Sequence, residues 1–412
     1  MPTFILQVHA RRLNFANSNG WCNLRQIEVI KDEIIDNNKD KYQDCSGVGI
    51  ICPYRNQVTE TKKCLKYHKI EIDTVHKFQG REKDTIIFST VVNDINSFVD
   101  DANLINVAVS RGVKEFIVVT SNKLFKRHVH LEISHLKLIG KPQWGRAKEL
   151  LAMIKAARDK GLEVTCDQYP YTATSTNMAA MVPGWAQSGG PEAMCERLTN
   201  PDKELLTEIK AEMERRGGAD KVLIISTRGK YPEFDGKTLA KAAEVLNLEP
   251  EMAVTVLLRA AGGGIPCCYF CLSEDDMLNI MRETFICVGS DGYALPFDKG
   301  LISTNPHPRS FGTFPRFLQT IREQQLMSLE AAIAKITALP AEILGLKDRG
   351  VIAIGKKADF TIFDASNIAD KSIYTDSLRK PTGINYVVID GKIALAKGEQ
   401  VGENFGRVLL HE

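Results

Sequence analysis

The sequence has no apolar run that approaches the roughly 20 residues needed to span a bilayer. Residues 1–8 contain no basic region, and their apolar stretch is too short for a secretory signal. Ten cysteines among 412 residues are too few and too irregularly spaced for a disulfide scaffold. These absences argue against membrane-spanning and small disulfide-rich secreted proteins. They indicate a cytoplasmic protein with reduced, mostly buried thiols.

An excess of one charge sign is also lacking. The 53 lysines and arginines nearly balance the 51 acidic residues, so the net charge is only +2. This balance argues neither for nor against a nucleic-acid partner, because a basic face can be offset by an acidic domain elsewhere. A hydrophobic content of 44% and a charged content of 25% are ordinary for a globular protein, and 412 residues suffice for two or three domains.

Residues 1–126 are predicted to form an α/β domain with a partial, doubly wound parallel sheet. Apolar, β-branched runs separated by helical stretches are typical of strands that are buried on both faces. Three such runs occur, at 48–52, 85–92 and 115–120, and a further strand is expected at 70–75, where apolar and polar residues alternate.

A second α/β pattern begins at residue 131, with no Gly-, Ser- or Pro-rich linker before it. Residues 131–345 are predicted to form this part, with a helix-rich insertion at about 178–259. Its strands are expected at 131–135, 162–167, 265–272 and 285–289, and its helices at 147–160 and 329–337. Residues 346–412 are predicted to form a small β domain with tight turns. Its β segments are expected at 350–355, 358–363 and 386–391.

Two arginines in the first part suit a phosphate-sensing role. Arg55 lies just past the run at 48–52, and Arg111 follows the sequence NVAVS at 106–110. A guanidinium keeps its charge and binds phosphate bidentately, and ligands of open α/β sheets bind beside the strand ends. Both arginines are therefore candidate nucleotide-binding residues.

Three motifs in this part resemble motifs IV, V and VI of superfamily 1 helicases of the nonsense-decay type. They are CPYRNQ at 52–57, TVHKFQGREKD at 74–84 and NVAVSRG at 106–112. The resemblance implies a second RecA-like motor domain, with ATP, Mg²⁺ and nucleic acid as ligands. It implies that Arg55 and Arg111 contact the γ-phosphate, and that Gly80 and Glu82 occupy nucleotide-contacting positions.

The chain nevertheless lacks the sequence Gly-x-x-x-x-Gly-Lys-Ser/Thr, the loop that cradles the β-phosphate and places the magnesium ion. We therefore expect a folded but inert motor domain.

Asp291 is the strongest catalytic candidate in the second part. It follows the apolar run at 285–288, and Gly292 after it allows a sharp turn. A carboxylate at a strand end can take a proton from a metal-bound water and pass it to a leaving amine. The alternative is a turn aspartate that caps the next segment.

Each of three further residues has two possible roles. His135, at the end of the run at 131–135, is either a metal ligand or a packed, hydrogen-bonded residue. Asp167 could bind a metal or orient the Tyr-Pro-Tyr loop that follows it. Arg309 could bind a substrate carboxylate or pair with an internal carboxylate. His128 and His130 form a His-x-His pair that we interpret as coincidental, and Cys268 and Cys271 are expected to be buried thiols.

Residues from 131 onward resemble N-acyl-D-amino-acid deacylases, the D-aminoacylase group of the amidohydrolase superfamily. The motifs are ISHLK at 133–137, DQYPY at 167–171, GSDG at 289–292, HPR at 307–309 and DRGVIAIGKKADF at 348–360. The resemblance implies a zinc-dependent (β/α)8 barrel with a small β-sandwich, which hydrolyses the amide bond of N-acylated D-amino acids.

The same resemblance implies roles for single residues. His135 would be a zinc ligand, with Asp167 as a further candidate, and Asp291 would be the general acid/base. The substrate would be bound by Tyr171, His307 and Arg309.

This part departs from the family pattern in its metal ligands. The early His-x-His, the metal-binding cysteine and a second histidine ligand are missing, and the match begins at about the fifth of eight barrel strands. We therefore expect an incomplete barrel with impaired amide hydrolysis. The alternatives are a nucleic-acid-dependent ATPase or helicase fragment and a non-catalytic fusion product. The oligomeric state is left open.

Overall fold

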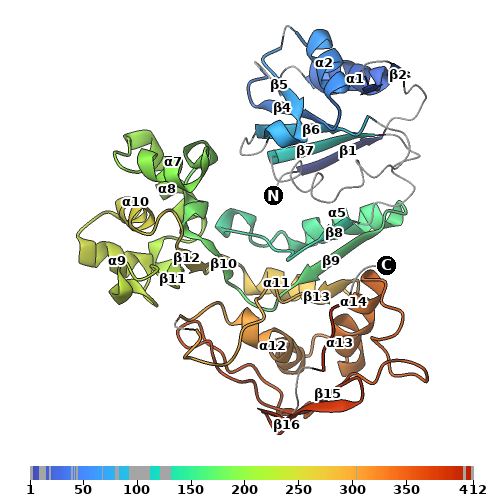
Figure 1. Ribbon diagram of the computed structural model, residues 1–412, viewed down its shortest axis with the longest axis vertical. Coiled ribbons are helices and arrows are strands. Elements are labelled where there is room, and N and C mark those ends of the chain that lie inside the picture. Colours follow the sequence, from blue (N-terminus) through green and yellow to red (C-terminus); the bar gives the residue numbers. More distant parts are fainter. Residues whose placement is uncertain are drawn as a thin grey trace. The chain divides into compact units, whose positions relative to one another are not determined.

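The computed structural model describes residues 3–8, 15–17, 20–38, 40, 42, 45–66, 68–78, 83–91, 112–120, 131–302, 304–401 and 405–409. The chain divides into two compact units (Figure 1). Unit 1 comprises Met1–Val129 with Gln187–Gly190, and unit 2 comprises His130–Ala186 with Pro191–Glu412. No helix in the described ranges is long and apolar enough to cross a membrane.

Unit 1 is built on a five-stranded parallel sheet, which confirms the parallel α/β architecture predicted for this part. The strand order is β1 (Thr3–Val8), β7 (Gly112–Thr120), β6 (Lys83–Ser89), β4 (Val48–Cys52) and β5 (Glu71–Thr74). All five residues of β4 are buried, as expected for a continuous apolar run covered on both faces.

The described residues of unit 1 also form further elements. They are β2 (Phe15–Asn17), β3 (Gly20–Cys22), α1 (Leu24–Glu28), η1 (Val29–Ile35), η2 (Asp36–Asn38), α2 (Arg55–Cys64) and η3 (Val75–Phe78).

A buried polar network joins α1, α2 and the carboxyl end of β6. The side-chain oxygen Oε1 of Gln57 accepts a hydrogen bond from the Asn23 backbone N–H at 2.7 Å. The side-chain nitrogen Nε2 of Gln57 donates to Ser89 Oγ at 3.1 Å. Ser89 Oγ donates in turn to the Gln26 side chain at 2.7 Å, and the same Gln26 oxygen accepts the backbone N–H of Val91 at 2.9 Å. Every polar atom removed from water here is paired, which is why the network is tolerated in the core.

Unit 2 contains a three-stranded parallel sheet with the order β13 (Ile286–Val288), β9 (Val164–Gln168) and β8 (Leu131–Ile133). Helix α5 (Ala147–Asp159) links β8 to β9 and packs against α11 (Glu274–Met281) (Figure 1). Their buried faces form one apolar cluster with the strands, which includes Leu151, Ile154, Cys166, Ile280 and Ile286.

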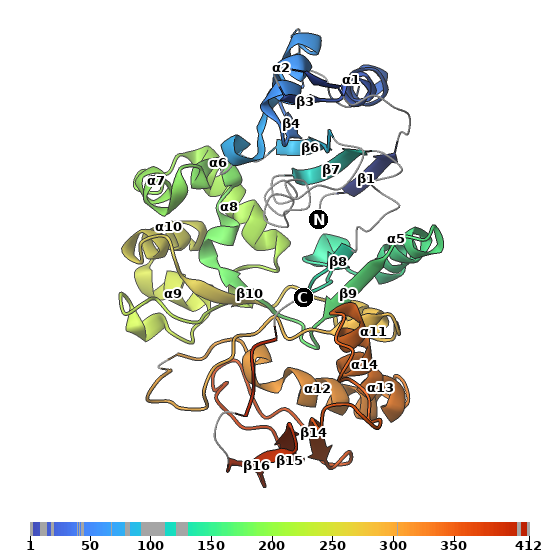
Figure 2. The ribbon, with the colours of Figure 1, turned by 45° about the vertical axis from the view of Figure 1, so that its right-hand side comes forward.

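The helix-rich stretch predicted at 178–259 surrounds a second sheet, which is antiparallel. Its order is β10 (Thr174–Asn177), β12 (Pro266–Tyr269) and β11 (Val222–Ile224). The strand expected at 265–272 is therefore part of this antiparallel sheet and not of the parallel one. Figure 2 shows the helices gathered beside β10, in green and yellow. They are η5 (Met178–Met181), α6 (Gly184–Gln187), α7 (Gly190–Arg197), α8 (Lys203–Arg215), α9 (Leu239–Leu246) and α10 (Pro250–Ala260).

The last part of unit 2 consists of three helices and a four-stranded antiparallel sheet. The helices are α12 (Arg309–Gln324), α13 (Leu329–Ile336) and α14 (Ala338–Ile343). The strands follow chain order: β14 (Phe360–Phe363), β15 (Ile384–Ile389), β16 (Lys392–Ala396) and β17 (Glu399–Gln400).

The predicted tight turns are present between these strands. Asp390 and Gly391 join β15 to β16 with φ values of 49° and 79°, which suit an Asp-Gly hairpin turn. The β segment expected at 350–355 is instead a loop, bounded by Gly350 and Gly355 at φ values of 88° and 85°.

Candidate active site

The turn after β8 holds His135 in a left-handed backbone conformation, with φ at 46°. Asp167, near the end of β9, supports this turn with both carboxylate oxygens. Oδ1 accepts the His135 backbone N–H at 2.7 Å, and Oδ2 accepts the Ser134 hydroxyl at 3.0 Å. Gly289 allows the close approach of Asp167, because a Cβ atom there would lie 2.7 Å from Oδ1. Asp167 therefore orients the loop that carries His135.

Asp291 and Arg309 form an ion pair. Nη1 of Arg309 lies 2.8 Å from Oδ2 of Asp291, and the two side chains are 9% and 35% exposed. Asp291 follows β13 in a left-handed conformation, with φ at 48°, and Arg309 is the first residue of α12. Of the two roles left open for Arg309, the structure shows the pairing with an internal carboxylate. The exposed part of Asp291 remains accessible to a ligand.

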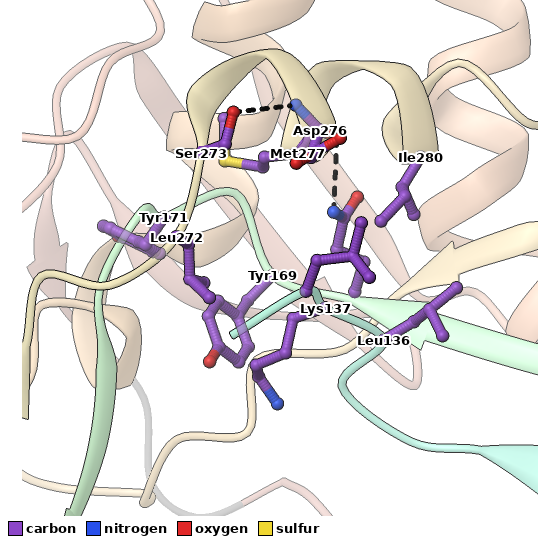
Figure 3. Close-up of a pocket in the computed structure, with 11 residues that line it drawn as sticks. Leu136, Lys137, Tyr169, Tyr171, Leu272, Ser273, Asp276, Met277 and Ile280 are labelled. Carbon is purple, nitrogen blue, oxygen red and sulfur yellow. Dashed lines mark hydrogen bonds between the residues drawn. The ribbon is translucent and has the colours of Figure 1, made fainter. Parts of the chain in front are cut away.

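Two cationic side chains approach the aromatic ring of Tyr169. Lys137 Nζ is 5.3 Å from the centre of its ring, and the Arg309 guanidinium carbon is 4.9 Å from it. The residue is only 3% exposed, and its hydroxyl has no hydrogen-bond partner in the described part of the chain. Burial raises the pKa of this phenol, so it stays a hydrogen-bond donor. Figure 3 shows Lys137 beside the Tyr169 ring.

Lys137 is a half-buried amine that also contacts His135, the predicted zinc ligand. Its Nζ lies 2.6 Å from Nδ1 of His135. Burial lowers the pKa of Lys137 to about 8, against the opposing effect of the Asp291 charge. A fraction of this lysine is therefore neutral at weakly alkaline pH.

Lys137 and Tyr169 also line a small cavity. A cavity of about 10 Å³ lies among Leu136, Gln168, Met277 and Ile280, with Lys137 and Tyr169 also on its wall (Figure 3). This volume holds about one water molecule. This cavity is therefore too small to hold a substrate.

Tyr171 and His307 lie deeper than a substrate-binding role suggests. Tyr171 is 1% exposed and donates a hydrogen bond to Asp370 at 2.9 Å. His307 is 3% exposed, and both of its ring nitrogens have backbone partners. The substrate-binding roles predicted for these two residues stay predictions.

The described residues of this site do not fit a zinc ion. Nowhere in the described ranges do three His, Cys, Asp or Glu side chains converge on a metal position. Asp167 has both oxygens in hydrogen bonds, Asp291 is paired with Arg309, and His135 Nδ1 faces Lys137. His135 and Asp167 as metal ligands therefore stay predictions.

In unit 1, Arg55 lies where the sequence analysis expects it. It is the first residue of α2, exposed, and follows the carboxyl end of β4 in the parallel sheet. Gly80, Glu82 and Arg111 lie outside the described residues. The nucleotide-binding roles of all four remain untested.

Sequence reasoning missed Lys137 and Tyr169, although both stand inside the motifs at 133–137 and 167–171. Their place inside these two motifs was the available signal. The unpaired Tyr169 hydroxyl has no sequence signal. Cys268 and Cys271 are buried free thiols, as predicted.

Two classes of protein correspond to the two parts of the chain. Residues 1–123 match the family model of an AAA domain, and residues 293–395 match that of the amidohydrolase family. The first part is similar to superfamily 1 helicases of the DNA2 and Sen1 type, and the second part is similar to amidohydrolases of the D-aminoacylase type. Both predicted resemblances are confirmed.

Particular relatives make the second resemblance more specific. The N-acyl-D-aspartate deacylase of Alcaligenes xylosoxydans xylosoxydans is 34% identical over 278 residues, which cover 67% of this chain and 46% of that protein. A D-aminoacylase structure with a binuclear metal centre superposes with a TM-score of 0.53 at 27% identity, covering 79% of this chain and 56% of that one.

The N-acyl-D-glutamate deacylase of Bordetella bronchiseptica, complexed with zinc and a phosphonate inhibitor, superposes with a TM-score of 0.51 at 25% identity. The match covers 85% of this chain and 66% of that structure. The chain spans about half the length of the curated deacylases it matches. On the helicase side, DNA2 of Gallus gallus is 29% identical over 148 residues, covering 29% of this chain and 15% of that protein.

Proposed function

We propose that residues 131–409 form an amidohydrolase-type site that binds an N-acylated D-amino acid through its carboxylate. The observation that carries the proposal is the buried Tyr169 hydroxyl, which has no partner among the described side chains and belongs to a ring that both Lys137 and Arg309 approach. An unpaired buried hydroxyl costs about 1–3 kcal/mol, so a ligand that accepts its hydrogen bond removes that penalty. A carboxylate also matches the charge of the two neighbouring cations.

The relatives support this substrate class. The similar proteins include deacylases named for N-acyl-D-glutamate and N-acyl-D-aspartate, and both of these molecules carry an α-carboxylate. Under this proposal β8, β9 and β13 are adjacent strands of a (β/α)8 barrel, and the sheet from β14 to β17 is part of a small β-sandwich.

Asp291 is the proposed acid/base of the hydrolytic reaction. It is partly exposed and is held beside the Arg309 guanidinium by their ion pair. A carboxylate there takes a proton from the attacking water and returns it to the leaving amine. Arg309 has five N–H donors, so it can keep Asp291 in place while it binds the substrate carboxylate. This role needs only the carboxylate and the attacking water.

Binding is the direct test. Isothermal titration of the full chain with N-acetyl-D-glutamate is compared with the α-carboxamide of the same compound and with the L enantiomer. We expect the carboxamide to bind at least about tenfold more weakly, and Tyr169→Phe to remove most of that difference. Equal affinity for the acid and its amide would sink the proposal. Free D-glutamate and bound zinc are measured on the same samples, which separates hydrolysis from binding.

A second candidate function is nucleic-acid-dependent ATP hydrolysis by residues 1–123, which the place of Arg55 beside β4 favours. The chain lacks a phosphate-cradling Gly-x-x-x-x-Gly-Lys-Ser/Thr loop, so we expect no ATPase activity above background with single-stranded nucleic acid. If ATP hydrolysis is measured and Arg55→Ala abolishes it, ATP hydrolysis would become the first candidate function. A fusion product with neither activity is the third alternative, and rapid limited proteolysis without a stable core would favour it.

A further inference from the structure

His307 is a buried histidine whose two ring nitrogens both face backbone atoms. Nδ1 lies 3.0 Å from the backbone nitrogen of Arg309, and Nε2 lies 3.1 Å from the backbone oxygen of Ala173. A backbone N–H can only donate, so Nδ1 must be the acceptor and Nε2 must carry the ring hydrogen. This tautomer leaves no ring nitrogen for a substrate or a metal.

The hydrogen bond to Nδ1 gives a partner to the backbone N–H of Arg309, the first residue of α12. The position before the helix is Pro308, which provides no side-chain cap. The first N–H groups of a helix have no partner inside it, and a buried unpaired N–H is costly. The His307 imidazole therefore acts as the cap of this helix, at its first N–H.

Neighbouring aromatic rings pack around the imidazole and restrict its rotation. The rings of Tyr171 and Tyr374 meet it edge-on, each at 5.1 Å between centres, with interplanar angles of 87° and 83°. Tyr169 is tilted against it at 6.2 Å. Burial and the Arg309 charge lower the pKa of His307 to about 3, so the ring remains neutral and keeps its acceptor at neutral pH.

We infer that His307 is a positioning residue, whose Nδ1 fixes the backbone of Arg309 so that the guanidinium reaches both Asp291 and the Tyr169 ring. Arg309 begins α12, and its side chain is 2.8 Å from Asp291. A shift of its backbone nitrogen would turn the side chain away from both partners. The inference rests on the proposed function where it concerns ligand binding, and on geometry alone where it concerns Arg309.

Two substitutions separate the two ring nitrogens. His307→Asn places a side-chain oxygen near the position of Nδ1 and keeps the acceptor for Arg309. His307→Gln reaches the position of Nε2, keeps a donor for Ala173 and loses that acceptor. Positioning through Nδ1 predicts that the Asn variant retains the Arg309 geometry and that the Gln variant loses it.

The first readout needs no ligand. In arginine-labelled protein, the Nε–H resonance of Arg309, assigned with Arg309→Lys, reports whether the Asp291 pair is intact. We expect His307→Asn to keep the wild-type shift and His307→Gln to move it to the position seen in Asp291→Asn. The same shift in both variants would overturn the inference.

The second readout is the dissociation constant for N-acetyl-D-glutamate. We expect a loss of about tenfold in the Gln variant, a loss within about threefold in the Asn variant, and no change for the α-carboxamide. If the wild type does not bind the ligand, the proposed function fails, while the resonance of Arg309 still decides the role of His307.

A third measurement uses the wild type only, in case a variant does not fold. The ¹⁵N shifts of His307 show which ring nitrogen carries the hydrogen. We expect Nε2 to be protonated and Nδ1 to be bare, and the opposite tautomer would contradict the inference.

Discussion

The phenol of Tyr171 donates a 2.9 Å hydrogen bond to Oδ2 of Asp370, which lies 199 residues further along the chain. The Asp370 side chain is only 1% exposed, and its Oδ1 accepts the backbone N–H of Ser372 at 2.8 Å. Arg316 lies over the Tyr171 ring at 4.7 Å and within 3.8 Å of the same Oδ2. This contact ties the segment after β14 to the loop after β9.

Tyr171→Phe is expected to lower the free energy of unfolding by about 1–3 kcal/mol, because Oδ2 of the buried Asp370 carboxylate loses the hydrogen bond from the phenol. Urea denaturation measures the change. Tyr293→Phe is the matched control, since Tyr293 is 76% exposed and its substitution should have almost no effect. Equal losses for the two variants would show that the Asp370 contact contributes nothing.

The stability of unit 2 is expected to fall in acid through His307. Its pKa is about 3 in the folded chain and near 6.5 in the unfolded chain, because burial and then Arg309 disfavour the imidazolium. Between these two values the unfolded chain binds a proton that the folded chain does not. The free energy of unfolding therefore falls as pH falls through this window, by at most about 1.4 kcal/mol per pH unit, and is unaffected by this group above it.

Urea unfolding at pH 7.5, 6 and 5 checks this dependence. His307→Asn should reduce the slope below pH 6.5, because the variant has no titrating ring. An unchanged slope would assign the acid sensitivity to other groups.

Gly312→Ala is expected to destabilise unit 2, although alanine favours helices. A Cβ atom at Gly312 would lie 2.0 Å from Oδ1 of Asp370, so the carboxylate or α12 must move. Overpacking of this kind costs about 1–3 kcal/mol, which exceeds the roughly 1 kcal/mol that alanine gains over glycine in a helix. Thermal unfolding measures the change, and Gly406→Ala, which meets open space, is the control. A rise in the melting temperature for Gly312→Ala would refute the expected clash.

Gln57→Leu is expected to destabilise unit 1 by about 1–3 kcal/mol. The substitution leaves the Asn23 backbone N–H and the Ser89 hydroxyl without the Gln57 side chain, in a site that is fully buried. Hydrogen exchange of the β4 and β6 amides measures the local loss. Lys62→Ala, on the exposed face of α2, should leave their exchange unchanged. Unaltered protection in Gln57→Leu would contradict a stabilising role for the network.

Local elements were predictable because their patterns are local. The buried run at 48–52 became β4, and the helix expected at 147–160 became Ala147–Asp159. The Asp-Gly pair at 390–391 forms the expected tight turn. Each of these depends on neighbours within a few residues, where apolar periodicity and turn chemistry act directly.

Partnerships over long distances in sequence were not predictable. The sequence leaves open whether Arg309 binds a substrate carboxylate or an internal one, and only the fold places it 2.8 Å from Asp291. The strand expected at 265–272 has an unambiguous apolar pattern, yet the pattern does not say that its partners are β10 and β11. Strand pairing is decided by packing between distant segments, which single-sequence periodicity does not encode.

By itself, the sequence determined which residues are apolar, where the chain can turn and which two families its motifs resemble. The tertiary structure alone decided that Lys137 and Arg309 approach the Tyr169 ring, and that the Tyr169 hydroxyl is buried without a described partner. The physical reason is that the burial of a side chain and its distance from charged groups depend on how distant segments pack in the folded chain. The pKa of Lys137 and the tautomer of His307 follow from surroundings that arrive from β9, β13 and α12.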